Sequence, residues 1–224
     1  MSEVLQHRTF SARLDCHYLL KLPAKIDSHT LLVVALHGFG QSAEIMFALA
    51  EKMFGPRHLV AALQGPNQFF VDPKSMQVGY GWNTSRNAAG SIRLHHDMVT
   101  QVLNDAGREH GIPRDRRILV GFSQPVSLNY RFVATCPGEV RGVVGVCGGL
   151  PGDWETGIYQ PVTASVLHIA RRQDEWYPPN VTEQYSERLR LRVKDVEFHL
   201  LEGGHQFPSK GNVIVEGWLG RILR

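Results

Sequence analysis

The chain of 224 residues is long enough for one globular domain with a sizeable buried core. Its hydrophobic fraction of 43% is ordinary for a globular protein, and its formal net charge of +3 is too small to indicate a nucleic-acid partner or binding to a membrane surface. No apolar run is long enough to span a bilayer and the N-terminus has no apolar signal segment, so we expect a cytoplasmic protein without a membrane span.

Apolar runs alternate with segments of helical periodicity from about residue 30 onward. The apolar runs predict buried strands at 31–36, 59–63, 117–121, 140–146, 164–169 and 196–201. The periodic segments predict helices around 42–53, 92–106, 124–135, 178–189 and 213–222. A more alternating segment at 8–22 predicts an antiparallel edge strand, and the polar, aromatic-rich stretch at 64–87 predicts a loop.

Alternation of strands and helices predicts an α/β fold, with a mostly parallel sheet covered by helices on both faces. Neither repeats nor linkers divide the chain, so we expect residues 1–224 to form a single domain without a large lid. In such a sheet, ligands bind at the carboxyl ends of the strands. His37, Ser123, Asp174 and His205 each follow a predicted strand, which indicates that they share this edge.

Ser123 lies in the segment Val-Gly-Phe-Ser-Gln-Pro, between a predicted strand and a predicted helix. A sharp strand–turn–helix connection lifts a serine hydroxyl clear of the sheet, where it can act as a nucleophile. The hydroxyl is a poor nucleophile near neutral pH and needs a base to accept its proton. His205 suits this role, because it lies in a glycine-containing loop after the last strand and an imidazole titrates at about pH 6.5.

A carboxylate is needed to orient the imidazole and to stabilise the imidazolium that forms during the reaction. Asp174 follows a predicted strand and stands before Tyr177-Pro178, whereas its neighbour Glu175 is an alternative acid. The chain order of serine, acid and histidine is known from α/β serine hydrolases. We therefore predict a catalytic triad of Ser123, Asp174 and His205.

The negative charge that develops on a substrate oxygen must be met by fixed donors. The backbone N–H groups of Gln124 and of Phe39, within His37-Gly-Phe-Gly, are the predicted oxyanion-hole donors. Large aromatic residues near these loops are predicted to contact substrate together with Gly38. These predicted substrate-binding residues are Gly38, Trp82, Phe122 and Trp176.

We predict neither a metal nor an organic cofactor. The three cysteines, Cys16, Cys136 and Cys147, cannot all pair, and their spacing matches no metal-ligand set. The adjacent pair His95-His96 falls on a predicted helix, where neighbouring side chains point in different directions. No Gly-Lys-Ser/Thr follows the glycines after His37, so a phosphate-binding loop is not predicted there.

Several motifs together resemble the phospholipase/carboxylesterase group of α/β-hydrolases, which includes small carboxylesterases and acyl-protein thioesterases, with dienelactone hydrolase as a more distant relative. The matching motifs are Leu36-His-Gly-Phe-Gly-Gln, Gly121-Phe-Ser-Gln, Cys147-Gly-Gly-Leu-Pro, Asp174 with Tyr177-Pro178, and Gly203-Gly-His205. The resemblance implies cofactor-free hydrolysis by Ser123, Asp174 and His205. We expect small-molecule esters with short or medium acyl chains as substrates, and thioesters or lysophospholipids are the alternative.

Pro125 departs from the group, which has glycine at this position. Proline is tolerated in the first turn of a helix, but it disfavours the helical conformation for the preceding Gln124 and adds bulk. We expect the triad to assemble nevertheless, with a modest loss of rate. The alternative is a catalytically silent relative that serves as a binding module.

Overall fold

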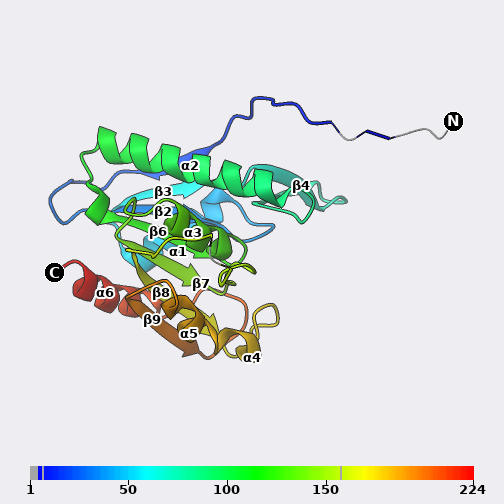
Figure 1. Cartoon of the computed structure of the whole chain (residues 1–224). Coiled ribbons are helices and arrows are strands. Elements are labelled where there is room, and N and C mark those ends of the chain that lie inside the picture. Colours follow the sequence, from blue (N-terminus) through cyan, green and yellow to red (C-terminus); the bar gives the residue numbers. More distant parts are fainter. Residues whose placement is uncertain (1–4, 7, 157) are drawn as a thin grey trace.

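The computed structural model describes residues 5–6, 8–156 and 158–224 (Figure 1). A central sheet of seven strands has the order β1-β3-β2-β6-β7-β8-β9. These strands are β1 (Tyr18–Lys21), β2 (Leu32–Leu36), β3 (Leu59–Leu63), β6 (Arg117–Phe122), β7 (Gly142–Val146), β8 (Ser165–Arg171) and β9 (Val196–Leu201). The edge strand β1 pairs antiparallel with β3, and the other neighbouring strands of the sheet pair in parallel, which confirms the predicted sheet.

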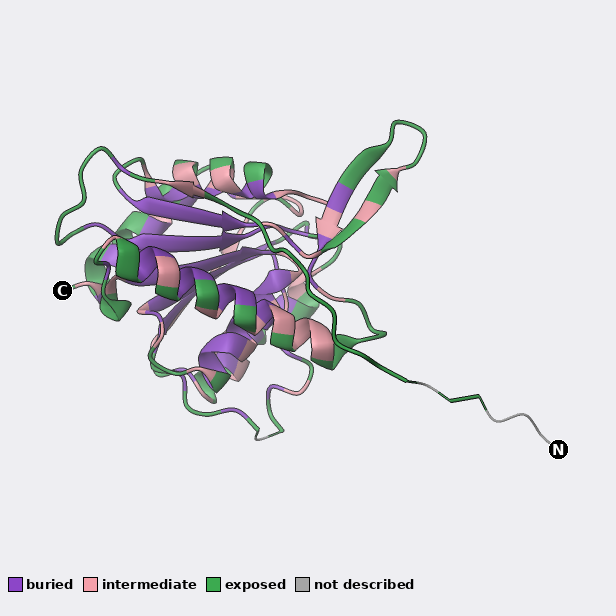
Figure 2. Cartoon of the chain, turned by 90° about the horizontal axis from the view of Figure 1, so that it is seen from above, coloured by how far each residue is buried: buried purple, intermediate pink, exposed green. Residues whose placement is uncertain are grey.

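Helices cover both faces of this sheet (Figures 1 and 2). They are α1 (Ala43–Phe54), α2 (Ala88–Glu109), α3 (Pro125–Thr135), α4 (Pro179–Thr182), α5 (Tyr185–Arg190) and α6 (Gly211–Ile222), with a short 3₁₀ helix η1 (Arg114–Arg116). None of the helices in the described residues combines the length and apolar character that crossing a bilayer requires.

Two buried layers of side chains hold the helices against the sheet. In β2, Leu32 and Val34 point into the layer shared with α2 and α3, whereas Val33 and Ala35 point into the layer shared with α1 and α6. Successive side chains of a strand face opposite sides, so a strand buried on both faces must be apolar throughout. This is why the continuous apolar runs predict central strands correctly.

The predicted loop at 64–87 is partly wrong, because it contains the antiparallel hairpin of β4 (Asn67–Asp72) and β5 (Gln77–Gly81). Figure 2 shows this hairpin projecting from the body of the protein. The hairpin is exposed over much of its length, so it lacks the buried apolar run by which a strand is recognised. Its turn is closed by Asp72, whose carboxylate accepts the backbone N–H of Lys74 at 2.9 Å.

Two other boundaries also differ from the sequence-based expectation. The predicted edge strand at 8–22 is restricted to Tyr18–Lys21, and the described residues before it are exposed. The helix predicted at 178–189 is divided into α4 and α5. The edge strand is shorter than predicted because the backbone groups of a strand need a partner, and β3 pairs only with residues 18–21 of this segment.

Two of the buried histidines, His95 and His168, are held in the neutral form by their surroundings. Nδ1 of His168 in β8 lies 2.8 Å from the Tyr130 hydroxyl oxygen, and Nε2 of His95 in α2 lies 3.1 Å from the Asn129 side-chain oxygen. Burial lowers the pKa of His168 to about 3. Burial, followed by the neighbouring His96, lowers the pKa of His95 to about 3 as well. Both imidazoles are therefore neutral in the folded protein near neutral pH.

We expect the free energy of unfolding to fall as the pH drops below about 6.5, because the unfolded chain then binds protons that the folded chain does not. The loss should continue to about pH 3, with each histidine contributing at most about 1.4 kcal/mol per pH unit. Urea unfolding at several pH values between 7 and 5 measures the slope of the free energy of unfolding against pH. His168→Gln should reduce it, whereas the exposed-site control His17→Gln should not, and equal slopes in all three proteins would contradict the assignment.

Candidate active site

Ser123 occupies a strained turn directly after β6. Its φ of +61° lies in the left-handed region, which is uncommon for a residue other than glycine. The Ser123 N–H donates to the Val146 carbonyl at 2.8 Å, and the Ser123 carbonyl accepts the Val126 N–H at 3.2 Å. These bonds hold the serine between the end of the sheet and the start of α3, as the strand–turn–helix pattern predicts.

Ser123, His205 and Asp174 are brought together from three separate loops. The Nε2 atom of His205 lies 2.9 Å from the Ser123 Oγ atom. On the other side of the ring, Nδ1 lies 3.0 and 2.9 Å from the two carboxylate oxygens of Asp174. When Nδ1–H donates to Asp174, Nε2 is left free to accept the serine proton.

The Asp174 carboxylate is buried and fixed by the backbone that follows it. Its Oδ1 atom accepts the N–H groups of Trp176 at 2.9 Å and Tyr177 at 3.0 Å. Of the two candidate acids, both in the described part of the chain, Asp174 contacts His205, whereas Glu175 is exposed. The geometry therefore favours Asp174 as the acid.

The two predicted oxyanion-hole groups are positioned by different loops. Within the described residues, neither the Phe39 N–H nor the Gln124 N–H donates a hydrogen bond to another protein group. The Gly38 N–H, by contrast, donates to the Gln41 side-chain oxygen at 3.0 Å. The N–H groups of Phe39 and Gln124 are therefore available to a ligand, whereas that of Gly38 is not.

A hydrogen-bond network fixes both of these loops through Trp82. The indole N–H of Trp82 donates to the His37 carbonyl at 2.8 Å, and its backbone N–H donates to the Gln124 side-chain oxygen at 2.8 Å. His37 in turn accepts the Gly65 N–H at 2.9 Å. Trp82 is fully buried, so it is enclosed by protein and not presented at an accessible surface. It supports the loops of Phe39 and Gln124 from within the core.

Phe122 and Gly38 also lie behind the site rather than at its surface. Phe122 is buried, and its ring centroid lies 5.0 Å from that of His205. A Cβ atom on Gly38 would lie only 2.8 Å from the Phe122 ring, so this close approach requires glycine. Trp176, with 72% of its surface exposed, is the predicted substrate-binding residue that remains accessible.

The sequence-based predictions missed three contributions to the site. The side chains of Gln41 and Gln124 bond to backbone groups, and the Tyr177 ring stacks on His205 at a centroid distance of 5.9 Å. The Gly-Phe-Ser-Gln motif marked Gln124 only for its backbone N–H. In the sequence, Tyr177 is distinguished only by its spacing from Asp174. Hydrogen bonds and ring contacts between loops that are far apart in the chain leave no periodic pattern in the sequence.

Cys147 is another polar group beside Asp174 and His205. Its Sγ atom and donor atoms of Asp174 and His205 lie within 4.8 Å of one another, as the ligands of a metal could. Burial, followed by the charge of Asp174, raises the pKa of the Cys147 thiol to about 12. A thiol must lose its proton to bind a metal well. A Cys147 thiol that stays protonated is a poor metal ligand, so this donor set does not suit a metal ion.

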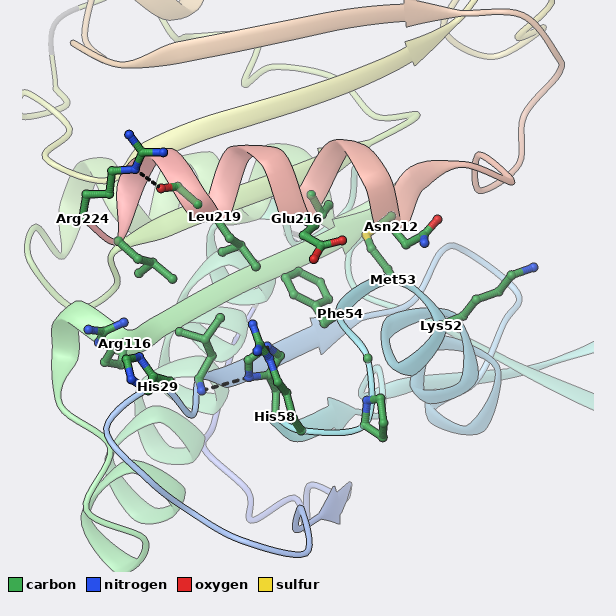
Figure 3. Close-up of a pocket in the computed structure, with 17 residues that line it drawn as sticks. His29, Lys52, Met53, Phe54, His58, Arg116, Asn212, Glu216, Leu219 and Arg224 are labelled. Carbon is green, nitrogen blue, oxygen red and sulfur yellow. Dashed lines mark hydrogen bonds between the residues drawn. The ribbon is translucent and has the colours of Figure 1, made fainter.

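A separate pocket of about 710 Å³ lies between α1 and α6 (Figure 3). Its lining includes Leu31, His58 and Arg116, which stand just before β2, β3 and β6. Ser123 and Asp174 stand after strands of the same parallel sheet. The pocket is consequently at the opposite edge of the sheet from Ser123 and Asp174.

Comparisons with known proteins agree with this architecture. The solved structures that resemble the chain include esterase PE8, with a TM-score of 0.73 and 22% identity over 93% of this chain and 100% of that one. A Bacillus cereus carboxylesterase has a TM-score of 0.73 and 15% identity over 92% of this chain and 94% of that one. Acyl-protein thioesterase 2 from Zea mays has a TM-score of 0.69 and 16% identity over 93% of this chain and 99% of that one. At these identities the likeness concerns the fold. No match was found among curated protein sequences.

A family model supplies the classification that these distant structures do not. The phospholipase/carboxylesterase model matches residues 20–216, which is most of the chain. The strand order, the helices on both faces and the solved relatives are consistent with it. The chain belongs to the phospholipase/carboxylesterase family and has the α/β-hydrolase fold.

Proposed function

We propose that this protein is a serine carboxylesterase that hydrolyses short- to medium-chain carboxylic esters through an acyl-enzyme on Ser123. The observation that carries the proposal is the continuous hydrogen-bonded path from the Ser123 hydroxyl through His205 to Asp174. Membership of a hydrolase family supports the same reaction class. The proposed site needs no cofactor, because each proton transfer has a side chain in place.

In the first half of the proposed reaction, the Ser123 oxygen attacks the ester carbonyl while Nε2 of His205 accepts the serine proton. The Asp174 carboxylate, bonded to Nδ1, stabilises the resulting imidazolium. The tetrahedral intermediate collapses as its bond to the alcohol oxygen breaks. His205 gives its proton to that oxygen, and the alcohol leaves an acyl group on Ser123.

In the second half, a water molecule attacks the acyl carbonyl and gives a proton to Nε2 of His205. Collapse of the second intermediate breaks the bond to the Ser123 oxygen, which recovers its proton from His205. The carboxylic acid is released and the free enzyme is restored. In both halves the N–H groups of Phe39 and Gln124 would meet the negative oxygen, and each such donor contributes on the order of 3–4 kcal/mol.

Pro125 is compatible with this mechanism. It is the first residue of α3, where its missing N–H would have no partner within the helix. Gln124 adopts φ −52° and ψ −48° despite the proline that follows it, and its N–H still lacks a protein acceptor within the described residues. The departure from the family pattern therefore leaves the proposed oxyanion donor in place. This supports an active enzyme over a silent relative.

The packing beside Ser123 favours short and medium acyl chains. Phe122 packs on His205 and Trp82 is bonded to Gln124, and both side chains are buried, so a deep acyl channel would require them to move. A longer chain would instead lie over exposed aromatic side chains such as Phe39 and Trp176. Methylene groups that stay in water gain little free energy on binding.

We expect p-nitrophenyl butyrate to be hydrolysed with a higher kcat/KM than the palmitate ester, measured in the same detergent. A matched butyryl thioester measured in parallel reports whether oxygen or sulfur esters are preferred. A fluorophosphonate probe should label the wild-type protein, because labelling requires an activated serine. Faster turnover of the palmitate ester would contradict the chain-length proposal, and absence of both labelling and turnover would favour the binding-module alternative.

A further inference from the structure

A second, smaller pocket lies beside the loop that carries His205. Its volume is about 270 Å³, and it is bounded by α1, the end of β8, the loop at 202–210 and the start of α6. The polar side chains that line it are Lys52, Arg171, Gln206, Ser209 and Asn212. None of its lining residues, all within the described part of the chain, is acidic.

Arg171, the last residue of β8, is the unusual member of this lining. Arg171 is only 6% exposed. Its guanidinium nevertheless forms no hydrogen bond or ion pair with any described residue. The next residue, Arg172, pairs with Glu202 at 3.1 Å. Burying a charge without a partner is costly, so a buried guanidinium facing a pocket is expected to have an anion as its partner.

The loop of His205 is built closely over this guanidinium. Gly203 has a φ of +120°, and a Cβ atom placed on it would lie 2.7 Å from the Arg171 Cζ atom. Any side chain at position 203 would therefore displace the arginine. The carbonyl of Gln206, further along the same loop, accepts a hydrogen bond from the Cys147 thiol at 3.5 Å. The loop is thus in contact with both the pocket and the neighbourhood of the triad.

The start of α6 adds a second source of positive potential. This helix has 12 residues, no acidic side chain in its first turn and no side-chain cap on its N-terminal N–H groups. The Gly211 N–H donates to the Pro208 carbonyl at 3.1 Å, so the N–H groups left for a ligand are those of the next residues, and such groups at a helix N-terminus attract anions. Ser209 and Asn212 stand on either side of this terminus, and Lys52 of α1 also lines the pocket.

We propose that this pocket binds a phosphate-type oxyanion, either free or as the phosphate of a small ester, and that its occupancy holds the loop of His205 in place. The Arg171 guanidinium supplies paired N–H donors for two anion oxygens, and the α6 terminus and the Ser209 hydroxyl supply donors for others. The volume admits a phosphate with accompanying water. Anion binding at this site does not require the proposed esterase reaction and can be tested without it.

Thermal unfolding in sodium phosphate, against sodium chloride of equal ionic strength and pH, tests the proposal. Phosphate should raise the Tm of the wild-type protein saturably. Arg171→Met should remove this rise without lowering the Tm in chloride, because it deletes an unpaired buried charge. Arg108→Met, at an exposed position of α2, is the matched control and should retain the rise. Ser209→Asp, at an exposed position, should also abolish it by placing a carboxylate in the pocket.

Hydrogen exchange locates the effect. Phosphate should slow amide exchange between residues 203 and 212 in the wild-type protein and not in Arg171→Met. Glycerol 3-phosphate distinguishes the two sources of the anion: a larger Tm rise than phosphate indicates a phosphate ester, and a smaller one indicates free phosphate. The proposal is overturned if phosphate leaves the wild-type Tm unchanged, if both pocket variants respond as the wild type does, or if protection appears elsewhere.

Discussion

Replacing Ser123 with alanine should lower kcat for p-nitrophenyl butyrate by about 10⁴-fold or more and leave KM little changed. The substitution removes the serine oxygen that is proposed to attack the ester. The N–H groups of Phe39 and Gln124 stay in place to bind the carbonyl oxygen of the ester. The residual reaction would then depend on direct attack by water, helped only by binding and by the oxyanion donors. Initial rates on the ester series measure the loss.

Ser127→Ala is the matched control for this experiment. Ser127 lies one turn further along α3 and outside the hydrogen bonds of the triad. Its replacement should retain both turnover and fluorophosphonate labelling, whereas Ser123→Ala should lose both. Unchanged labelling of the Ser123→Ala protein would show that another nucleophile reacts, and the proposed acyl-enzyme would then be wrong.

Asp174→Asn should lower kcat by about 10⁴-fold while the protein remains folded. The substituted amide can donate a hydrogen bond to Nδ1, which favours the imidazole tautomer that carries its proton on Nε2. In that tautomer Nε2 cannot accept the proton of Ser123, which it contacts at 2.9 Å. The substitution therefore changes the tautomer of His205 while the imidazole itself stays in place. Comparing kcat with the thermal unfolding midpoint separates lost chemistry from lost structure.

Glu175→Gln is the control for the acid, because the sequence alone left these neighbouring carboxylates as alternatives. Glu175 is exposed, whereas Asp174 is buried and bonded to His205 through both carboxylate oxygens. The Glu175 variant should retain nearly full activity. A large loss in Glu175→Gln together with little loss in Asp174→Asn would reverse the assignment.

The central sheet and the order of the site residues could be predicted because both depend on local patterns. Continuous apolar runs such as 31–36 must form strands buried on both faces, and alternating helices leave little choice other than a parallel sheet. Ser123, Asp174 and His205 follow three of these strands, so the sheet itself brings them to one edge. The exposed β4–β5 hairpin was missed because it lacks a buried apolar run.

The surroundings of the site were decided by tertiary packing. Trp82 looked like a pocket wall in sequence, yet its backbone N–H is bonded to the side chain of Gln124, 42 positions further along the chain. Whether an aromatic side chain faces substrate or core depends on such distant partners. The same holds for Arg171, whose neighbour Arg172 pairs with Glu202 while Arg171 is buried beside the His205 loop. The sequence by itself determined which residues follow the strands and so reach one edge of the sheet. The tertiary structure decided which of their neighbours form supporting hydrogen bonds, which side chains are accessible, and that Arg171 has no partner among the described residues.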